Sequence, residues 1–288
     1  MNTVQIVSAA IIVVCLLPLL LAGKKYQAFI EPYKEPFQFV FLAPAGLYLI
    51  DKTRLIYRLS SRLVAIQQKV ATLYQAGREI QAYTKMYLAE IISSILICLL
   101  GGALLALANG GDQRMLILGG MMAVLLPAIS IKKLDDKVKL RKQAIIFELP
   151  EFASKIALLV NAGETCQKAL IRCTMMKQDD DNPLYKELKE SVTKIQNGES
   201  FSQVMEEFSK RCGVQEVSAF TTTILLNYRR GGDQLSLSLR ELAHTLWEKR
   251  KAISKTRGEQ ASSKLVFPMV FIFVAILLIV AYPALAIF

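Results

Sequence analysis

Apolar blocks alternate with charged segments along this chain of 288 residues, and no other feature of the sequence restricts the fold as strongly. About 20 apolar helical residues cross a bilayer core, which is about 30 Å thick. Four blocks approach or exceed that length, at residues 4–22, 88–108, 115–131 and 265–288. A single segment can satisfy its own backbone hydrogen bonds inside lipid only as a helix. The pattern therefore predicts an all-α, polytopic membrane protein.

The positions of the basic residues predict the topology. Lys24 and Lys25 follow the first block, so we interpret residues 4–22 as an uncleaved span with its N-terminus outside. Residues 88–108 and 115–131 are separated by a short polar loop, which predicts a transmembrane hairpin over residues 88–131. The last block, 265–288, is the predicted C-terminal span. We expect four spans in the cell (inner or cytoplasmic) membrane, with both ends outside.

The predicted topology explains the formal net charge of +11. Basic loops of membrane proteins stay cytoplasmic and contact anionic lipid headgroups. We therefore predict membrane lipid, and no nucleic acid, as the partner of these basic loops.

Two segments lie between the first span and the hairpin. Residues 37–50 are apolar but short, and Pro44 interrupts them, so we predict an interfacial or re-entrant segment within the N-terminal region 1–50. Residues 51–87 are predicted to form a cytoplasmic amphipathic helix, which packs on the membrane, on another helix of this protein or on a second copy. Its heptad seam consists of Ile56, Leu59, Leu63, Ile66, Val70, Leu73, Gly77 and Ile80.

Residues 132–264 contain a repeat that predicts a cytoplasmic domain. The stretch 163–170 is similar to 198–205 and more weakly to 232–239. Each copy has a glycine at the end of one helix, where the backbone takes the left-handed conformation that glycine adopts without strain. Each copy also has a capping residue at the start of the next helix, whose side-chain oxygen accepts a hydrogen bond from a free backbone N–H of the first turn. These predicted turn residues are Gly163 with Thr165, Gly198 with Ser200, and Gly232 with Asp233.

The repeat predicts three helical hairpins that share one core. The six expected helices cover approximately residues 142–161, 165–178, 183–197, 200–211, 214–230 and 233–258. Cys166 aligns with Phe201 across the repeat, so we predict that Cys166 and Cys173 are buried apolar contacts.

Small residues recur at every fourth position near the predicted hairpin loop, at Gly102, Ala106 and Gly110. Such spacing creates a flat helix face that a second helix can approach closely. Two interpretations fit: packing within the hairpin, or self-association between copies.

The sequence lacks the patterns of an enzyme. No glycine-rich phosphate loop is present, and the single histidine, His244, has no triad partner nearby in sequence. The aspartates at 179–181 stand before Asn182 and Pro183 without the spacing of a calcium loop. We therefore predict no catalytic residue, no metal and no cofactor.

Several short motifs together resemble the type II secretion F domain over residues 142–288. They are Leu149-Pro150-Glu151-Phe152, Asn161 to Gly163 with Ala169-Leu170, Asn197-Gly198 with Ser200-Phe201, Arg230-Gly231-Gly232, Lys264 to Pro268, and Tyr282-Pro283-Ala284. With one copy of the domain and a Phe-Pro pair in the last block, the chain looks most similar to TadC-like or TadB-like proteins of tight-adherence (Flp) pili.

The resemblance implies a non-enzymatic inner-membrane platform of a type IV (Flp/Tad-like) pilus or a type II secretion-like machine. Such a platform couples a cytoplasmic assembly ATPase to the movement of pilin subunits, beside a second platform protein or another copy of itself. Arg229 and Arg230, paired bases beside a Gly-Gly turn, are the candidate contacts for the ATPase. The alternative is a membrane-anchored, TPR-like adaptor that binds peptides, because a helical repeat of about this length also suggests such an array.

Overall fold

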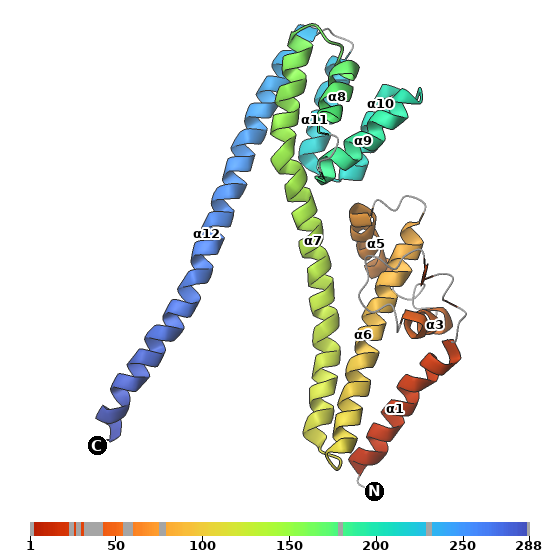
Figure 1. Ribbon diagram of the computed structural model, residues 1–288, viewed down its shortest axis with the longest axis vertical. Helices are drawn as coiled ribbons and strands as arrows, with labels where there is room; N and C mark the ends of the chain where they lie inside the picture. The colour runs from red at the N-terminus through yellow and green to blue at the C-terminus, as the bar shows by residue number, and fades with distance from the viewer. Residues whose placement is uncertain are drawn as a thin grey trace. The chain divides into compact units, whose positions relative to one another are not determined.

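A computed structural model describes residues 3–22, 26, 30–31, 43–53, 60–74, 79–177, 181–228 and 232–286, and every regular element in this part of the chain is a helix. The chain divides into two compact units, Met1–Arg141 and Lys142–Phe288. Figure 1 shows the helices with their labels.

The first unit is built around α6, Ile80–Ala108. Three shorter helices pack along it: α1 (Thr3–Ala22), α3 (Ala43–Thr53) and α5 (Ser60–Tyr74). The helix α3 covers the second half of the predicted interfacial segment, and residues 37–42 lie outside the described part of the chain. The buried residues that join these helices include Leu47, Ile50, Val70, Met86 and Ala89.

The single helix predicted over residues 51–87 is divided in the structure. Its described residues belong to the end of α3, to α5, and to α6 with its N-cap residue, and residues 54–59 and 75–78 lie outside the described part of the chain. Glu79, at the N-cap of α6, has φ −101° and ψ 8°, which is outside the helical range. The seam residues Leu63 and Val70 are buried. Val70 belongs to the core of the first unit, with Ile66 and Leu73 packed against it. The helix α5 thus contacts another helix of the same protein, α6.

The helices α6 and α7 (Gln113–Asn161) are joined by a tight turn. Gly102 and Gly119 face each other across them so closely that a Cβ built on Gly102 would lie 2.7 Å from the Cα of Gly119. Ala106 is fully buried on the same side of α6. Gly110 lies in the turn itself, with φ 71°. The small-residue face of α6 is thus occupied by the partner helix of its own hairpin.

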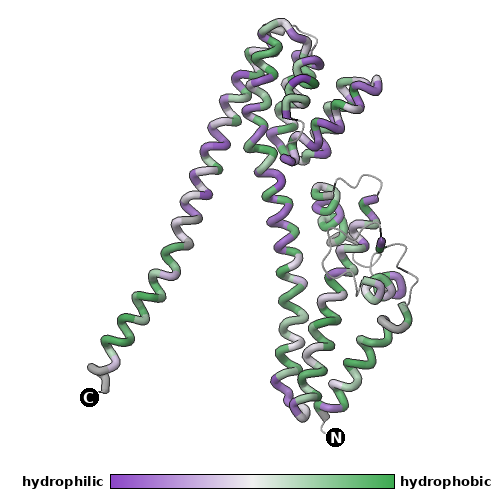
Figure 2. The backbone as a smooth tube through the Cα atoms, viewed as in Figure 1, coloured by the Kyte–Doolittle hydropathy of each residue, from purple (hydrophilic) through white to green (hydrophobic). Residues whose placement is uncertain are grey.

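Three helices in the described part of the chain are long and apolar enough to cross a membrane: Ile80–Ala108, Gln113–Asn161 and Gln234–Tyr282. Figure 2 shows long apolar stretches in each. In α1 the apolar stretch Val4–Pro18 is shorter. The all-α fold with membrane-spanning helices is confirmed. The fourth span and the orientation remain predictions.

The second unit places six helices around one core. They are the C-terminal part of α7, α8 (Cys166–Met175), α9 (Pro183–Gln196), α10 (Phe201–Cys212), α11 (Gln215–Asn227) and α12 (Gly232–Ala286). Phe152 on α7 lies at the centre of an aromatic cluster, with ring centroids 6.0 Å from Tyr185 and 5.9 Å from Phe220. Burial of such large rings supplies much of the stability of a small bundle.

Two boundaries differ from the sequence expectation. The third apolar block and the first bundle helix are one continuous helix, α7, and the last bundle helix continues through the apolar block 265–288 as far as Ala286. Hydropathy changes at residues 132 and 265, and we placed domain boundaries there. Helices end where backbone hydrogen bonding ends, and polar residues with good helix propensity do not interrupt it.

Candidate functional site

The bundle of the second unit depends on the turns between its helices. Gly163 and Gly198 have φ values of 93° and 89°, a conformation that L side chains rarely adopt. Thr165 caps α8, and its side-chain oxygen accepts a hydrogen bond from the Lys168 backbone N at 3.4 Å. Ser200 occupies the N-cap of α10 without a side-chain cap bond. The first two predicted turns therefore stand between consecutive helices.

The third predicted turn is only partly described. The helix α12 begins at Gly232, so Asp233 lies within its first turn, and the structure does not describe the Asp233 side chain. Arg229 and Arg230, the predicted ATPase contacts, lie outside the described residues. Their role stays a prediction from the sequence.

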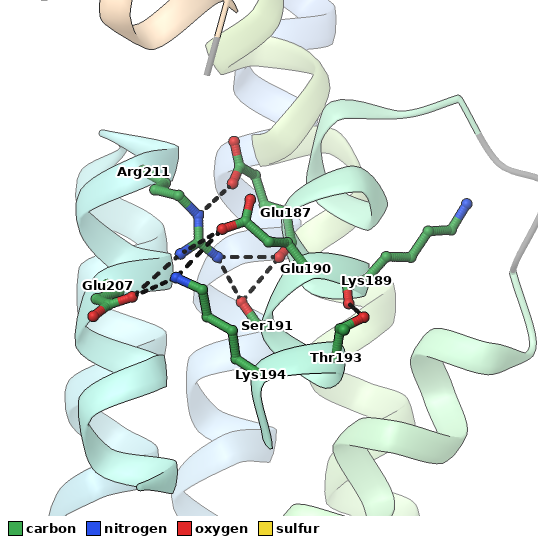
Figure 3. A network of polar contacts seen from close by, with 8 residues as sticks. All are labelled: Glu187, Lys189, Glu190, Ser191, Thr193, Lys194, Glu207 and Arg211. Carbon is green, nitrogen blue, oxygen red and sulfur yellow. Dashed lines mark hydrogen bonds and ion pairs between the residues drawn. The ribbon is translucent and has the colours of Figure 1, made fainter. Parts of the chain in front are cut away.

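A buried ion pair joins α9 to α10 (Figure 3). The Glu187 side chain is fully buried, and its Oε2 accepts a hydrogen bond from Arg211 Nε at 2.8 Å. Arg211 Nη2 also donates to the Glu187 carbonyl oxygen and, at 2.8 Å, to Ser191 Oγ. Several bonds to one guanidinium offset the cost of removing both charges from water. This pair fixes the angle between two helices and leaves no carboxylate free for chemistry.

A second group of charged side chains, more exposed than the buried pair, lies next to it. Lys194 Nζ lies 2.7 Å from Glu207 Oε2 and 3.4 Å from Glu190 Oε1. The hydrogen bond to Glu207 raises the pKa of Lys194, and the same bond lowers the pKa of Glu207. Both groups are therefore held in their charged forms, and the network in Figure 3 is structural.

Sequence reasoning missed the Glu187–Arg211 pair. The available signal was the helical period, because Glu187 falls between Leu184 and Ser191 on the face of α9 that is buried. A carboxylate at such a position requires a cationic partner. The identity of that partner depends on how α10 packs, and the spacing along one helix contains no information on this.

Contacts of α7 hold it to α8, α9 and α12. Lys177, just after α8, donates to Glu148 Oε2 at 2.8 Å, which raises the Lys177 pKa, and its ammonium lies 5.0 Å from the Tyr185 ring centroid on α9. On α12, Arg250 Nη1 donates to the Phe147 carbonyl oxygen at 2.9 Å. The guanidinium of Arg257 lies 4.9 Å from the Phe147 ring centroid. The two long helices are thus fixed to each other where they leave the bundle.

Two open grooves lie on the surface of the second unit. One, of about 400 Å³, is lined by Ser154, Leu158, Arg240, Ala243, His244 and Trp247, from α7 and α12. The other, of about 670 Å³, is lined by Glu164, Lys168, Ile171, Arg172, Met175 and Met176. Open apolar grooves of this kind suit protein contacts better than the enclosure of a small substrate.

The chemical groups of the unit are arranged for packing. Burial raises the pKa of the Cys166 thiol to about 12 and that of Cys173 to about 11, so neither is a thiolate at neutral pH. Both are buried, as predicted from the repeat. The Ser154 hydroxyl donates to the Pro150 carbonyl and is not directed at His244. Within the described residues, no group of three or more His, Cys, Asp or Glu side chains could hold a metal ion.

The bundle with its long C-terminal helix coincides with one family model. Residues 152–283 match the model described as "Type II secretion system (T2SS), protein F". Residues 152–283 form a type II secretion F domain. The resemblance found in the sequence is confirmed at the level of the family. No curated protein and no solved structure gives a match to the chain.

The F domain indicates the general class of function, that of a secretion or pilus platform protein. F-domain proteins are in general non-catalytic platform proteins, which interact with other components of a secretion or pilus machine. The F domain and the long apolar helices together indicate an inner-membrane protein.

Proposed function

We propose that this chain is the inner-membrane platform of a tight-adherence (Flp) pilus or of a closely related type II secretion-like machine. In this role it couples a cytoplasmic assembly ATPase to the movement of pilin subunits, and it acts beside a second platform protein or another copy of itself. The observation that carries the proposal is the F-domain match over residues 152–283. TadC-like and TadB-like proteins are the relatives that the sequence motifs favour.

The shape of α12 supports a coupling role. Its 55 residues include core residues of the bundle, such as Leu239 and Leu246, and continue without a break to Ala286. A helix that runs from the bundle into the apolar segment links the two directly, so a tilt of the bundle is transmitted to the apolar end, and Pro268 is the position where the helix can bend. A partner that binds the F domain can therefore act on the membrane segment directly.

The distribution of charge supports a cytoplasmic F domain. The chain has 35 Lys and Arg against 24 Asp and Glu, and the segments that flank the long apolar helices are basic. Positive residues are retained on the cytoplasmic side of the membrane. We infer a multi-pass topology in which the F domain faces the cytoplasm.

We infer that the chain itself is not an enzyme. The sequence has no phosphate-binding loop, and the thiols of Cys166 and Cys173 are buried with raised pKa values. A machine that does work on pilins then needs its energy from a separate ATPase. The F-domain match also favours a platform over the TPR-like adaptor, because it covers the repeat on which the adaptor hypothesis was based.

The direct test is deletion of the gene in a strain that has no functional paralogue. We expect loss of surface fibres or of secretion, restoration by the wild-type gene, and recovery of a hexameric ATPase when the chain is purified from crosslinked membranes. Normal fibres and normal secretion in the deletion strain would contradict the proposal.

Cysteine labelling tests the topology separately. Asp112→Cys lies in the turn between α6 and α7, and Ser262→Cys lies on an exposed part of α12. A membrane-impermeant maleimide is expected to label Asp112→Cys in intact spheroplasts and Ser262→Cys only after permeabilisation. The reverse pattern would place the F domain outside and would overturn the cytoplasmic assignment.

A further inference from the structure

The groove between α7 and α12 has an exposed apolar surface. Leu158 is 64% exposed and Trp247 is 44% exposed. Leu237, which is 60% exposed, lies on the same face of α12, because residues 237, 240, 244 and 247 follow the helical spacing of three and four. Exposed large apolar side chains that gather on one face of a domain mark a contact surface.

The charge of this groove is cationic and uncompensated. Arg240 makes no hydrogen bond or ion pair with any described residue, and no carboxylate lines the groove. Other bases of α12 have partners: Lys249 pairs with Glu216 on α11, and Arg250 donates to the Phe147 carbonyl. A ligand that complements the groove therefore presents apolar groups beside a negative charge.

The position of the groove along α12 excludes the bilayer as the occupant. Trp247 precedes Leu265, the first residue of the apolar block, by enough helical residues to separate them by about 27 Å along the axis at 1.5 Å per residue. The described side chains of α12 between them are mostly polar and mostly exposed. Lipid headgroups at the end of the apolar block do not reach that far along the helix, so the occupant belongs to the aqueous phase.

We propose that the α7–α12 groove is the docking site for an amphipathic helix of a partner protein, with an apolar face flanked by Asp or Glu. Apolar side chains at positions i, i+3 or i+4, and i+7 of that helix pack on Trp247 and Leu158, and a carboxylate pairs with Arg240. Tryptophan and arginine are the residues that most often dominate binding energy at such contacts. The proposal rests on the proposed function, in which a soluble partner acts on the F domain, and adds the surface and the chemistry of that contact.

The intrinsic fluorescence of the protein provides the test. Trp247 is the single tryptophan of the chain, so its emission reports on the groove alone. The full-length protein in nanodiscs of zwitterionic lipid is titrated with a synthetic helical peptide that has a leucine face flanked by glutamates. A second peptide carries lysine at every glutamate position. We expect a blue shift with the acidic peptide and an affinity at least about tenfold above that of the lysine peptide.

Matched variants locate the binding. Arg240→Gln and Leu158→Ala are each expected to weaken the acidic peptide about tenfold. Lys255→Gln, an exposed cation on the same helix, and Leu226→Ala, an exposed leucine on α11, are expected to leave binding unchanged. Near-ultraviolet circular dichroism checks that each variant is folded. Equal affinity for the two peptides, or equal binding by all four variants, would overturn the proposal.

A cellular experiment separates this proposal from the proposed function. Leu158→Glu combined with Arg240→Glu reverses the charge of the groove and is expected to abolish fibres or secretion, whereas Leu226→Glu is not. If the deletion strain is defective but the groove variant behaves as wild type, the groove proposal fails and the platform function stands. If the deletion strain is normal, the platform function itself fails.

Discussion

The guanidinium of Arg250 lies over the ring of Phe147, 5.3 Å from its centroid, and donates a hydrogen bond to the carbonyl oxygen of the same residue. The ring of Trp247 also lies 4.9 Å from the Arg250 guanidinium. One side chain of α12 thus contacts both the backbone and the ring of Phe147 on α7. This contact connects α12 to α7 at the edge of the bundle.

Replacement of Arg250 tests that connection. Arg250→Ala removes a cation–π contact and a hydrogen bond, which together contribute about 1–3 kcal/mol. We expect a lower thermal midpoint in detergent and a changed near-ultraviolet signal from Trp247. Lys255→Ala, an exposed position on the same helix, is the matched control. Identical melting of the two variants would show that the contact does not hold α12 to α7.

The Glu187–Arg211 pair is expected to be more sensitive to loss of one partner than to loss of both. Arg211→Ala leaves a fully buried carboxylate without its cation and is expected to cost about 3–5 kcal/mol of unfolding free energy. The double variant Glu187→Met with Arg211→Met is expected to recover much of that loss. Urea unfolding of wild type, Glu187→Met, Arg211→Met and the double variant measures the coupling, with Lys210→Ala as the exposed control. A double variant as unstable as Arg211→Ala would contradict this view of the pair.

The Lys194–Glu207 pair predicts a pH dependence at the surface of the same network. The folded-state pKa of Glu207 lies below its ordinary value of 4.5, so its contribution is present above pH 4.5 and is lost as pH falls through the folded pKa. The Lys194 pKa is raised above 10.5, so its contribution is present below pH 10.5 and is lost as pH rises through the folded pKa. The stability difference between wild type and Glu207→Gln should therefore be constant near neutrality and vanish in acid. A difference that persists at pH 2 would sink this assignment.

Particular residues show how much of the fold the sequence could predict. The helix predicted over 183–197 is α9, Pro183–Gln196, because Asn182 caps it and proline fits the first helical position. Periodicity also placed Cys166 and Cys173 in the core. Signals of this kind depend on only a few neighbouring residues, so they can be recognised in the sequence.

Tertiary relationships were less accessible. The sequence permits two interpretations of the small-residue face that includes Gly102, because no local signal indicates that Gly119 lies opposite it. The groove of Leu158 and Trp247 also depends on residues far apart in the chain. Leu158 is as apolar as its buried neighbours Ala157 and Val160, and apolar character alone does not indicate that Leu158 is exposed.

Thr221 offers a stabilising change in the F domain. Its side-chain oxygen is buried and has no hydrogen-bond partner among the described residues. Thr221→Val keeps the shape and removes the unsatisfied hydroxyl, which is expected to raise the unfolding free energy by about 1 kcal/mol. Thr222→Val, at an exposed position on the same helix, should change it little. Equal midpoints for Thr221→Val and wild type in urea would indicate that the hydroxyl is satisfied in solution.

The contact between α6 and α7 permits a sharp comparison of two adjacent glycines. A Cβ on Gly102 meets the Cα of Gly119 at 2.7 Å, a distance that real Cβ contacts do not show, whereas a Cβ on Gly101 meets nothing within 4 Å. Gly102→Ala must therefore separate the two helices, and its cost is expected to be about 1–3 kcal/mol from disrupted packing. Gly101→Ala only raises the helix propensity at that position, so it is expected to leave the stability unchanged or to increase it slightly. Thermal unfolding in detergent compares the two variants, and a lower midpoint is expected for Gly102→Ala alone. Equal midpoints for the two alanine variants would mean that the hairpin does not pack through these glycines.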